Sequence, residues 1–303
     1  MSEPLLDSPT RCPAGCAAPL VDAYAVAGHP VRRCVDCGLY QLVAVPQSTV
    51  DGQLDRSKFD DAFRELRQSG YARILDAAAK LRPIVGARVL DVGCSSGWFL
   101  EAARQRGARG FGIEPDRFFF DRARRALPED VALVHGLFPE DLPASWPRFD
   151  WITFHDVFEH LPDPRGVLAA CADRLAAGGL LVLSIPSSDG FAFRLSELLR
   201  KMGLAGPLER AFQVHYPFPH LWYLNRRSVE ALGRSAGFAT VGQLSLRGFR
   251  LRGSLRRAQM DRADPGARGL GVYANAAALA GFALLQPLVQ ADNIVAILRR
   301  DGE

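Results

Sequence analysis

A strand, a loop of small residues and a carboxylate at a set distance constrain this chain more than any other feature. Residues Val89 to Gly97 read Val-Leu-Asp-Val-Gly-Cys-Ser-Ser-Gly, and Glu114 follows seventeen residues later at the end of Gly-Phe-Gly-Ile-Glu. Small residues let backbone N–H groups approach a ligand, and a carboxylate at the tip of the second strand can accept both hydroxyls of a ribose. The pattern therefore predicts a βαβ unit that binds an adenosine-containing cofactor.

An acid at the start of the loop narrows the choice of cofactor. A dinucleotide site uses Gly-x-Gly-x-x-Gly, because the pyrophosphate lies against backbone N–H groups at a helix N-terminus. Here the spacing is Asp-x-Gly-x-Ser-x-Gly, led by Asp91, which would repel phosphate but suits an ammonium group. At these residues the chain resembles the class I S-adenosylmethionine-dependent methyltransferases, and Ser95 conservatively replaces the middle glycine of their first motif.

The resemblance continues downstream, over about residues 60 to 245. Phe149 to Pro164 resembles the fourth strand and following turn of the ubiquinone-type O-methyltransferases, and Gly178 to Pro186 resembles the fifth strand. His220 to Tyr223, with Ala236 to Phe238, matches the end of the same pattern. The resemblance implies an α/β fold with a doubly wound, mostly parallel, seven-stranded Rossmann-like sheet, whose last strand, Asn293 to Leu298, is antiparallel. An oxidoreductase sheet or a sugar-nucleotide enzyme is the alternative.

The same resemblance assigns the cofactor S-adenosylmethionine and its contacts. The loop would wrap the methionine part, Asp91 would act on the ammonium group, and Glu114 would bind the ribose diol. Two alternatives stay open, in which Tyr71 only packs on the sheet and Glu114 is only an acid that caps a helix. Leu137 and Phe138 stand where the family frequently has an acid for the adenine amino group; Phe138 could stack on the base. The cofactor contacts are predicted to be Tyr71, Asp91, Gly93, Cys94, Ser95, Gly97, Trp98, Glu114, Pro115, Leu137, Phe138 and His155.

Methyl transfer to a hydroxyl or carbon acceptor needs in-line positioning and a base. Asp156, Glu159 and His160 stand at i, i+3 and i+4, which predicts one face of a helical turn beside His155. Three interpretations follow: His160 is a general base, the triad binds a divalent metal such as Mg²⁺ as in the resembling families, or the turn is structural. His220, before Leu-Trp-Tyr, is a second candidate base or else a capping or surface histidine.

Four of the six cysteines cluster near the N-terminus. Cys12 and Cys16 form one pair, Cys34 and Cys37 the other, and seventeen residues separate the pairs. This spacing is typical of a tetrathiolate zinc ribbon, which is closed to catalysis and supplies folding free energy to a short segment. The alternatives are four free thiols or, less suited to a cytoplasmic chain, disulfides. Similar heads in some sugar and natural-product methyltransferases imply a cap near the active-site mouth.

The pattern of motifs predicts four regions. These are a zinc-ribbon module over 1–48, a linker with the start of a helix over 49–70, a cofactor-binding domain over 71–246 and a final segment over 247–303. Residues 187–225 carry seven aromatic residues between the fifth strand and the next helix, which predicts either a lid over a partly apolar or sugar acceptor, or a small accessory core.

Composition limits location and partners. The 303 residues are 48% hydrophobic and 23% charged with a net charge of +4, typical of a globular protein, and no apolar leader follows Met1, so we expect a cytoplasmic protein.

The segment 247–268 contains seven arginines and only two aspartates, which indicates a solvated loop or a site for a phosphorylated or lipid-linked acceptor. The uncharged run 269–291 is interrupted by Pro287 and polar residues, so we expect a helix covering the sheet rather than a transmembrane helix, with peripheral membrane contact left open.

The leading hypothesis is a methyltransferase that acts on an oxygen, rather than a carbon or nitrogen, of a small molecule or a glycan- or lipid-linked precursor. One rival is an RNA methyltransferase, although no basic surface with interleaved aromatic residues supports nucleic acid as a partner. The other is a non-catalytic cofactor-binding module. The sequence predicts no oligomeric state.

Overall fold

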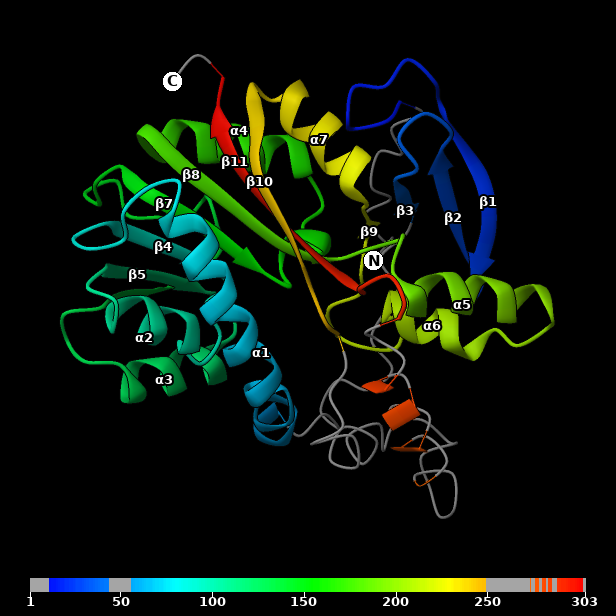
Figure 1. Cartoon of the computed structure of the whole chain (residues 1–303), viewed down its shortest axis with the longest axis horizontal. Helices are drawn as coiled ribbons and strands as arrows, with labels where there is room; N and C mark the ends of the chain where they lie inside the picture. Colours follow the sequence, from blue (N-terminus) through cyan, green and yellow to red (C-terminus); the bar gives the residue numbers. More distant parts are fainter. Residues whose placement is uncertain are drawn as a thin grey trace, which may run out of the picture.

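The computed structural model describes residues 11–43, 56–248, 288–301 and, between them, 273, 276–277, 280–281 and 283–284. These residues form two β-sheets with flanking helices (Figure 1). Most of the predicted linker, of the arginine-rich segment and of the uncharged run lies outside the described residues. Within the described part of the chain, no helix combines the length and apolarity that a membrane span requires.

The larger sheet has seven strands in the order β10-β11-β8-β7-β4-β5-β6. The five strands from β4 to β8 are parallel where they pair, whereas β11 is antiparallel to both β8 and β10. This arrangement confirms the predicted doubly wound, mostly parallel sheet with an antiparallel last strand. The strands are β4 (Arg88–Val92), β5 (Arg109–Glu114), β6 (Ala132–His135), β7 (Phe149–His155), β8 (Leu175–Pro186), β10 (Phe238–Leu246) and β11 (Asn293–Arg300).

Helices cover both faces of this sheet, which explains why its central strands are mostly apolar and buried. All seven residues of β7 are buried, as expected for a parallel strand with helices on both sides. Trp151 and Val89 pack with α1 and α2 on one face, whereas Ile152 and Leu90 pack with α4 and α7 on the other. The helices of the domain are α1 (Arg56–Ala79), α2 (Trp98–Arg104), α3 (Arg117–Ala126), α4 (Pro164–Arg174) and α7 (Arg226–Ser235).

The smaller sheet joins two distant parts of the sequence. Its order is β1-β2-β3-β9, formed by β1 (Leu20–Val26), β2 (His29–Cys34), β3 (Tyr40–Leu42) and β9 (Trp222–Tyr223). Next to it lie α5 (Phe191–Lys201) and α6 (Gly206–Phe212), on the side away from α2 and α3 (Figure 1). The N-terminal module and the segment predicted as a lid thus share one sheet and one small core, which includes Val31, Tyr40, Phe193 and Phe212.

Candidate active site

A cavity of about 1340 Å³ opens where the carboxyl ends of the central parallel strands meet. In an open α/β sheet this edge is where ligands bind, beside the point at which strand order reverses, here between β4 and β7. The cavity is larger than the usual small-molecule site, so it has room for a cofactor and an acceptor together. Fourteen predicted site residues line it: Tyr71, Asp91, Gly93, Cys94, Ser95, Glu114, Pro115, Leu137, Phe138, His155, Asp156, Glu159, His160 and His220.

The loop after β4 bends sharply toward the cavity because two residues adopt left-handed backbone conformations. Gly93 has φ +67° and Ser95 has φ +48°. The N–H groups of Gly93 and Cys94 both donate to the carbonyl of Ile113, at 2.8 and 3.2 Å, which holds the loop against β5. A Cβ on Gly93 would lie 2.6 Å from Cγ2 of Val157, so only glycine fits there.

Asp91 lies at the base of this loop with 3% of its surface exposed. The hydroxyl of Thr153 donates to Oδ1 of Asp91 at 2.8 Å, and Nε2 of His155 is 3.9 Å from the same atom. Burial raises the pKa of Asp91 to about 8, although the hydrogen bond from Thr153 acts in the other direction. A cationic group bound here would favour the ionised carboxylate.

Glu114 closes the other side of the loop. Its Oε2 accepts the N–H of Ser95 at 2.7 Å and its Oε1 accepts the N–H of Asp116 at 2.9 Å. Burial raises the pKa of Glu114 to about 7, and these two hydrogen bonds oppose the shift. Asp116, not Glu114, caps α3, since its carboxylate accepts the N–H of Phe118 at 2.8 Å. The alternative in which Glu114 serves only as a helix cap therefore does not describe this geometry.

Aromatic rings form the wall between the loop and α1. The ring of Tyr71 is 5.3 Å from Phe99 and 5.0 Å from His155, both edge to face. Burial lowers the pKa of His155 to about 3, so its imidazole is neutral. Tyr71 therefore both packs on the sheet and lines the cavity.

The part of the cavity predicted to hold the adenine is lined by Leu137 and Phe138. Leu137 is 58% exposed at the cavity, whereas Phe138 is buried and packs edge to face on Phe154. The carboxylate of Asp141 accepts the N–H of Leu137 at 2.7 Å, so one of its oxygens is already engaged.

Three of the predicted contacts, Gly97, Trp98 and Cys94, have side chains or Cβ positions that pack against the domain core. Gly97 and Trp98 are not among the cavity-lining residues, and a Cβ on Gly97 would lie 2.4 Å from Leu127. The sulfur of Cys94 packs beneath Gly112, in the small core beside Leu100.

At the acceptor end, three predicted residues converge. One ligand atom each from Glu159, His160 and His220 lies within 4.8 Å of the others. Nδ1 of His160 is 2.9 Å from the carbonyl of Pro219, which can only accept, so Nδ1 carries the proton and Nε2 carries the lone pair. Burial lowers the pKa of His160 below its usual value. The imidazole is thus neutral and suited to accept a proton.

Glu159 is the most deeply buried of the acids here, with 1% of its surface exposed. Neither of its carboxyl oxygens has a hydrogen-bond partner, and Nε2 of His220 is 3.9 Å from Oε1. Burial raises the pKa of Glu159 well above its usual value and lowers that of His220 well below, so burial favours the neutral form of both groups.

Asp156 lies apart from this cluster. Only Phe158–His160 forms a helical turn, of the 3₁₀ type, and Asp156 has φ +55°. Its Oδ1 accepts a hydrogen bond from Asn293 at 3.2 Å, and its Oδ2 is 3.7 Å from Nε of Arg67. The prediction that Asp156 shares one face of a helical turn with Glu159 and His160 is therefore wrong.

The converging donors, one carboxylate and two imidazoles, could hold a metal ion. Imidazole ligands are more typical of transition metals such as zinc than of Mg²⁺, which prefers oxygen ligands, so the divalent-metal interpretation stays a prediction.

Arg67 and Thr153 are site residues that the sequence analysis missed. Arg67 lines the cavity from α1, and its positive charge acts on His155 and Glu159 among others. Thr153 holds Asp91 from the neighbouring strand β7. The sequence signal for both was that they share a face with a predicted site residue. Arg67 lies one helical turn before Tyr71, and Thr153 lies two residues before His155 on the same face of a strand.

Comparisons with known proteins agree with this geometry. Residues 63–243 match the family described as "Methyltransferase domain". The chain belongs to the class I S-adenosylmethionine-dependent methyltransferases. It is 33% identical over 169 residues to a ubiquinone biosynthesis O-methyltransferase of Leptothrix cholodnii, a match that covers 50% of this chain and 68% of that protein. A protein of the same name from Xanthomonas campestris is 38% identical over 125 residues, covering 40% and 52%. The chain thus spans only about half the length of several of these relatives.

Solved structures show the same fold at low identity. The cyclopropane synthase MmaA2 from Mycobacterium tuberculosis has a TM-score of 0.55 at 19% identity, covering 76% of this methyltransferase and 83% of that chain. Magnesium protoporphyrin IX methyltransferase from Synechocystis PCC 6803, solved with bound S-adenosylhomocysteine, has a TM-score of 0.50 at 13% identity, covering 80% and 87%.

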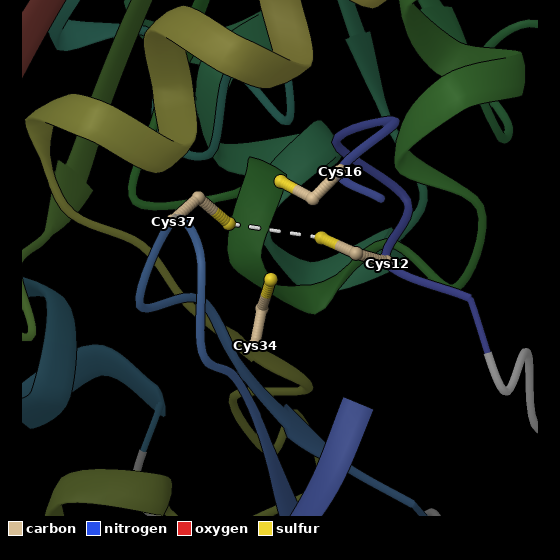
Figure 2. Close-up of side chains that lie close together, drawn as sticks. All are labelled: Cys12, Cys16, Cys34 and Cys37. Carbon is tan, nitrogen blue, oxygen red and sulfur yellow. Dashed lines mark hydrogen bonds between the residues drawn. The ribbon is translucent and has the colours of Figure 1, made fainter. Parts of the chain in front are cut away.

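The methyltransferase also brings its four N-terminal cysteines together, as predicted (Figure 2). Their sulfurs lie within 4.8 Å of one another, and those of Cys12 and Cys37 are 3.6 Å apart. The hydrogen bond from Cys37 lowers the pKa of Cys12 to about 5, whereas burial raises that of Cys16 to about 12. None of the six cysteines forms a disulfide. Four sulfurs that face one centre fit a tetrahedral zinc site, in which the ion would stabilise all four thiolates.

Proposed function

We propose that this methyltransferase transfers a methyl group to an oxygen of a small molecule or of a glycan- or lipid-linked precursor. The observation that carries the proposal is the neutral imidazole of His160, whose Nε2 keeps its lone pair because Nδ1 donates to Pro219. It shares one cavity with Asp91 and Glu114, the two acids of the cofactor motif.

The residues of the loop fit S-adenosylmethionine. Glu114 would bind the ribose hydroxyls, and Asp91 would attract the ammonium group, directly or through water. Burial raises the pKa values of both carboxylates, so a positively charged ligand would favour their ionised forms. When bound, the sulfonium supplies an electrophilic methyl group.

At the acceptor end, His160 would take the hydroxyl proton as the oxygen attacks. A hydroxyl becomes acidic only as its bond to the methyl group forms, so a neutral imidazole nearby is a suitable base. The proton moves to Nε2, and the carbonyl of Pro219 holds the ring through Nδ1. His220 lies beside this imidazole, and burial favours its neutral form, which does not repel the resulting positive charge. The carboxyl group of Glu159 lies beside it too, and it would attract that charge if it ionised.

Two observations support an oxygen acceptor with an apolar part. The relatives named above are O-methyltransferases. Aromatic residues of the predicted lid, Phe193, Tyr216 and Phe218, line the cavity. Phe212 and Trp222 lie in apolar cores, so part of the segment forms an accessory core while other residues of it line the cavity.

The test is a two-step measurement. Calorimetry with S-adenosylhomocysteine should show binding, and incubation of the protein with a methyl-labelled donor and a metabolite extract should then yield a labelled product with a new methyl ether or ester. Binding without any labelled product would favour a non-catalytic module. Label that disappears after ribonuclease treatment would favour the RNA enzyme.

We further propose that the four N-terminal cysteines bind a structural zinc ion. The donor set and its burial support this assignment, and a closed site leaves no position for substrate.

A further inference from the structure

The cysteine module is joined by strand pairing to the acceptor end of the cavity. On β3, Tyr40 pairs with Tyr223 and Gln41 with Trp222 of β9. The N–H of Leu42 then donates to the carbonyl of Leu221 at 2.8 Å, which extends the pairing toward His220.

The same stretch is bonded directly to the turn that carries the candidate base. The N–H of Leu221 donates to the carbonyl of Glu159 at 2.9 Å, and Nε1 of Trp222 donates to the carbonyl of Leu161 at 2.8 Å. The path from β3 to Glu159 therefore has only one residue, Leu221, between them.

Asn225 provides a second link, to the cysteines themselves. Its side chain is buried, and Nδ2 donates to the carbonyl of Cys37 at 3.1 Å, while Oδ1 accepts the N–H of Ser228 and caps α7. Gly38 makes this approach possible, since a Cβ there would lie 2.8 Å from Nδ2 of Asn225. Asn225 lies two residues after β9.

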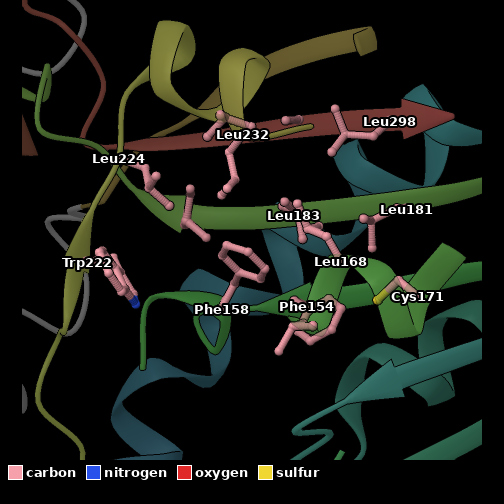
Figure 3. Packing of buried hydrophobic residues seen from close by; sticks show 14 of the residues in the cluster. Phe154, Phe158, Leu168, Cys171, Leu181, Leu183, Trp222, Leu224, Leu232 and Leu298 are labelled. Atoms are coloured by element: carbon pink, nitrogen blue, oxygen red, sulfur yellow. The ribbon is translucent and has the colours of Figure 1, made fainter. Parts of the chain in front are cut away.

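The two regions also share one apolar core. Cys12, Cys34 and Cys37 belong to the same buried cluster as Phe158 and Trp222. Figure 3 shows Trp222 and Phe158 in this cluster, near Leu224 and Leu232. Because protein cores are close-packed, we expect a shift of side chains in the cysteine module to alter the packing beneath the turn that carries Glu159 and His160.

The cofactor end is held by contacts of a different origin. Thr153 holds Asp91, and Ser95 is bonded to Glu114, all within the strands and loops of the large sheet. These hydrogen bonds of the cofactor end thus do not involve the cysteine module or β9.

We infer that the cysteine module positions the acceptor end of the active site, and that Asn225 is the positioning residue that transmits the geometry of the cysteine site. The inference rests on the proposed function for the role of Glu159, His160 and His220. The hydrogen bonds that connect the cysteine module to Leu221 and Glu159 do not depend on that function. A metal ion at the four cysteines would fix the position of the Cys37 carbonyl. The hydrogen bonds of Asn225 and β3 would in turn fix the backbone positions of Leu221 and Glu159.

The test compares the zinc-loaded full chain with its Asn225→Asp variant. Aspartate keeps an oxygen that caps α7 but places a second oxygen against the Cys37 carbonyl, so it removes only the link. Arg226→Gln is the matched control, because Arg226 on the same helix contacts Gln243 and Ser245 rather than the module.

Hydrogen–deuterium exchange gives a readout that does not depend on activity. In Asn225→Asp, protection of the Leu42 and Leu221 amides should fall about ten-fold, whereas Gly93 keeps its protection. Affinity for S-adenosylhomocysteine should stay within about two-fold of the wild type, while kcat with an identified acceptor falls. Arg226→Gln should match the wild type throughout.

Unchanged protection of Leu221 in Asn225→Asp would overturn the inference. So would a parallel loss of cofactor affinity, because it would indicate general destabilisation. Removing the metal from the wild type with a chelator should reproduce the exchange pattern of the variant. If wild-type protein does not bind S-adenosylhomocysteine, the proposed function fails, whereas the exchange comparison still decides the link.

Discussion

The N–H of Ser95 donates a 2.7 Å hydrogen bond to Oε2 of Glu114. This bond connects the loop after β4 to the end of β5, and the N–H of Asp116 occupies the other oxygen of the same carboxylate. A carboxylate oxygen can accept more than one hydrogen bond, so each oxygen keeps acceptor capacity for a ribose hydroxyl. The carboxylate thus shapes the loop before any ligand arrives.

Glu114→Gln should weaken S-adenosylhomocysteine binding about ten-fold or more, equal to about 1.4 kcal/mol. The amide has only one acceptor oxygen, and its NH₂ group would face an N–H donor of the loop. Calorimetry gives the affinity. Glu129→Gln, an exposed residue outside the cavity, is the matched control and should bind as the wild type does. Equal affinity in both variants would reject the assignment of Glu114.

Gly93→Ala should destabilise the protein by about 2–5 kcal/mol, through left-handed strain and overpacking against Val157. Gly86→Ala separates the two causes, because Gly86 has φ +74° and open space at its Cβ position. Urea unfolding should therefore show a smaller loss for Gly86→Ala. Adding Val157→Ala to Gly93→Ala should recover part of the difference. If the two single variants lose equal stability, the contact with Val157 is unimportant.

These two sites also show how much the sequence could predict. The bend at Gly93 and the acid at Glu114 are local, since each follows from residue type and spacing within one βαβ unit. The parallel order of the sheet follows for the same reason, because alternating strands and helices leave few ways to pack.

The acceptor end could be predicted only in part. Glu159 and His160 adjoin in sequence, but His220 joins them from a separate segment across the pairing of β9 with β3. Asp156 leaves the group because its left-handed backbone directs it toward Arg67 and Asn293. Such tertiary choices depend on packing, which the spacing of residues does not record.

Cofactor affinity should rise with pH between about 6 and about 8, since a positively charged donor binds the ionised forms of Asp91 and Glu114. In the free protein the pKa of Asp91 is raised to about 8 and that of Glu114 to about 7, so both are partly protonated at neutral pH. Binding must then release protons. Calorimetry in buffers of different ionisation enthalpy measures that release directly.

Thr153→Val provides the variant for the same measurement. Loss of its hydroxyl removes the hydrogen bond that lowers the pKa of Asp91, so the rise in affinity should move to higher pH. An affinity that is flat with pH in both proteins would contradict a role for these carboxylates in binding a cation.

The purified protein should contain about one zinc ion per chain, and Cys34→Ser should lose it, because three thiolates hold the ion more weakly than four. Metal analysis and a lower midpoint of thermal unfolding would check the result. Cys171→Ala is the control, since this buried thiol lies on α4 in the core, away from the four sulfurs. It should keep its metal. Zinc retained in full by Cys34→Ser would exclude the tetrathiolate site.

His160→Ala should lower turnover by about two to four orders of magnitude while cofactor affinity stays the same, because the imidazole accepts a proton but does not hold the donor. His215→Ala is the matched control, as His215 is exposed and contacts Glu209. The pH profile adds an independent check. A lowered pKa keeps His160 neutral down to mildly acidic pH, so wild-type turnover at saturating cofactor should fall only as pH drops below the usual range for histidine. In His160→Ala this acidic limb should disappear from the residual activity. Full turnover in the variant would show instead that the acceptor oxygen loses its proton to another group, and His220 would be the next candidate to substitute.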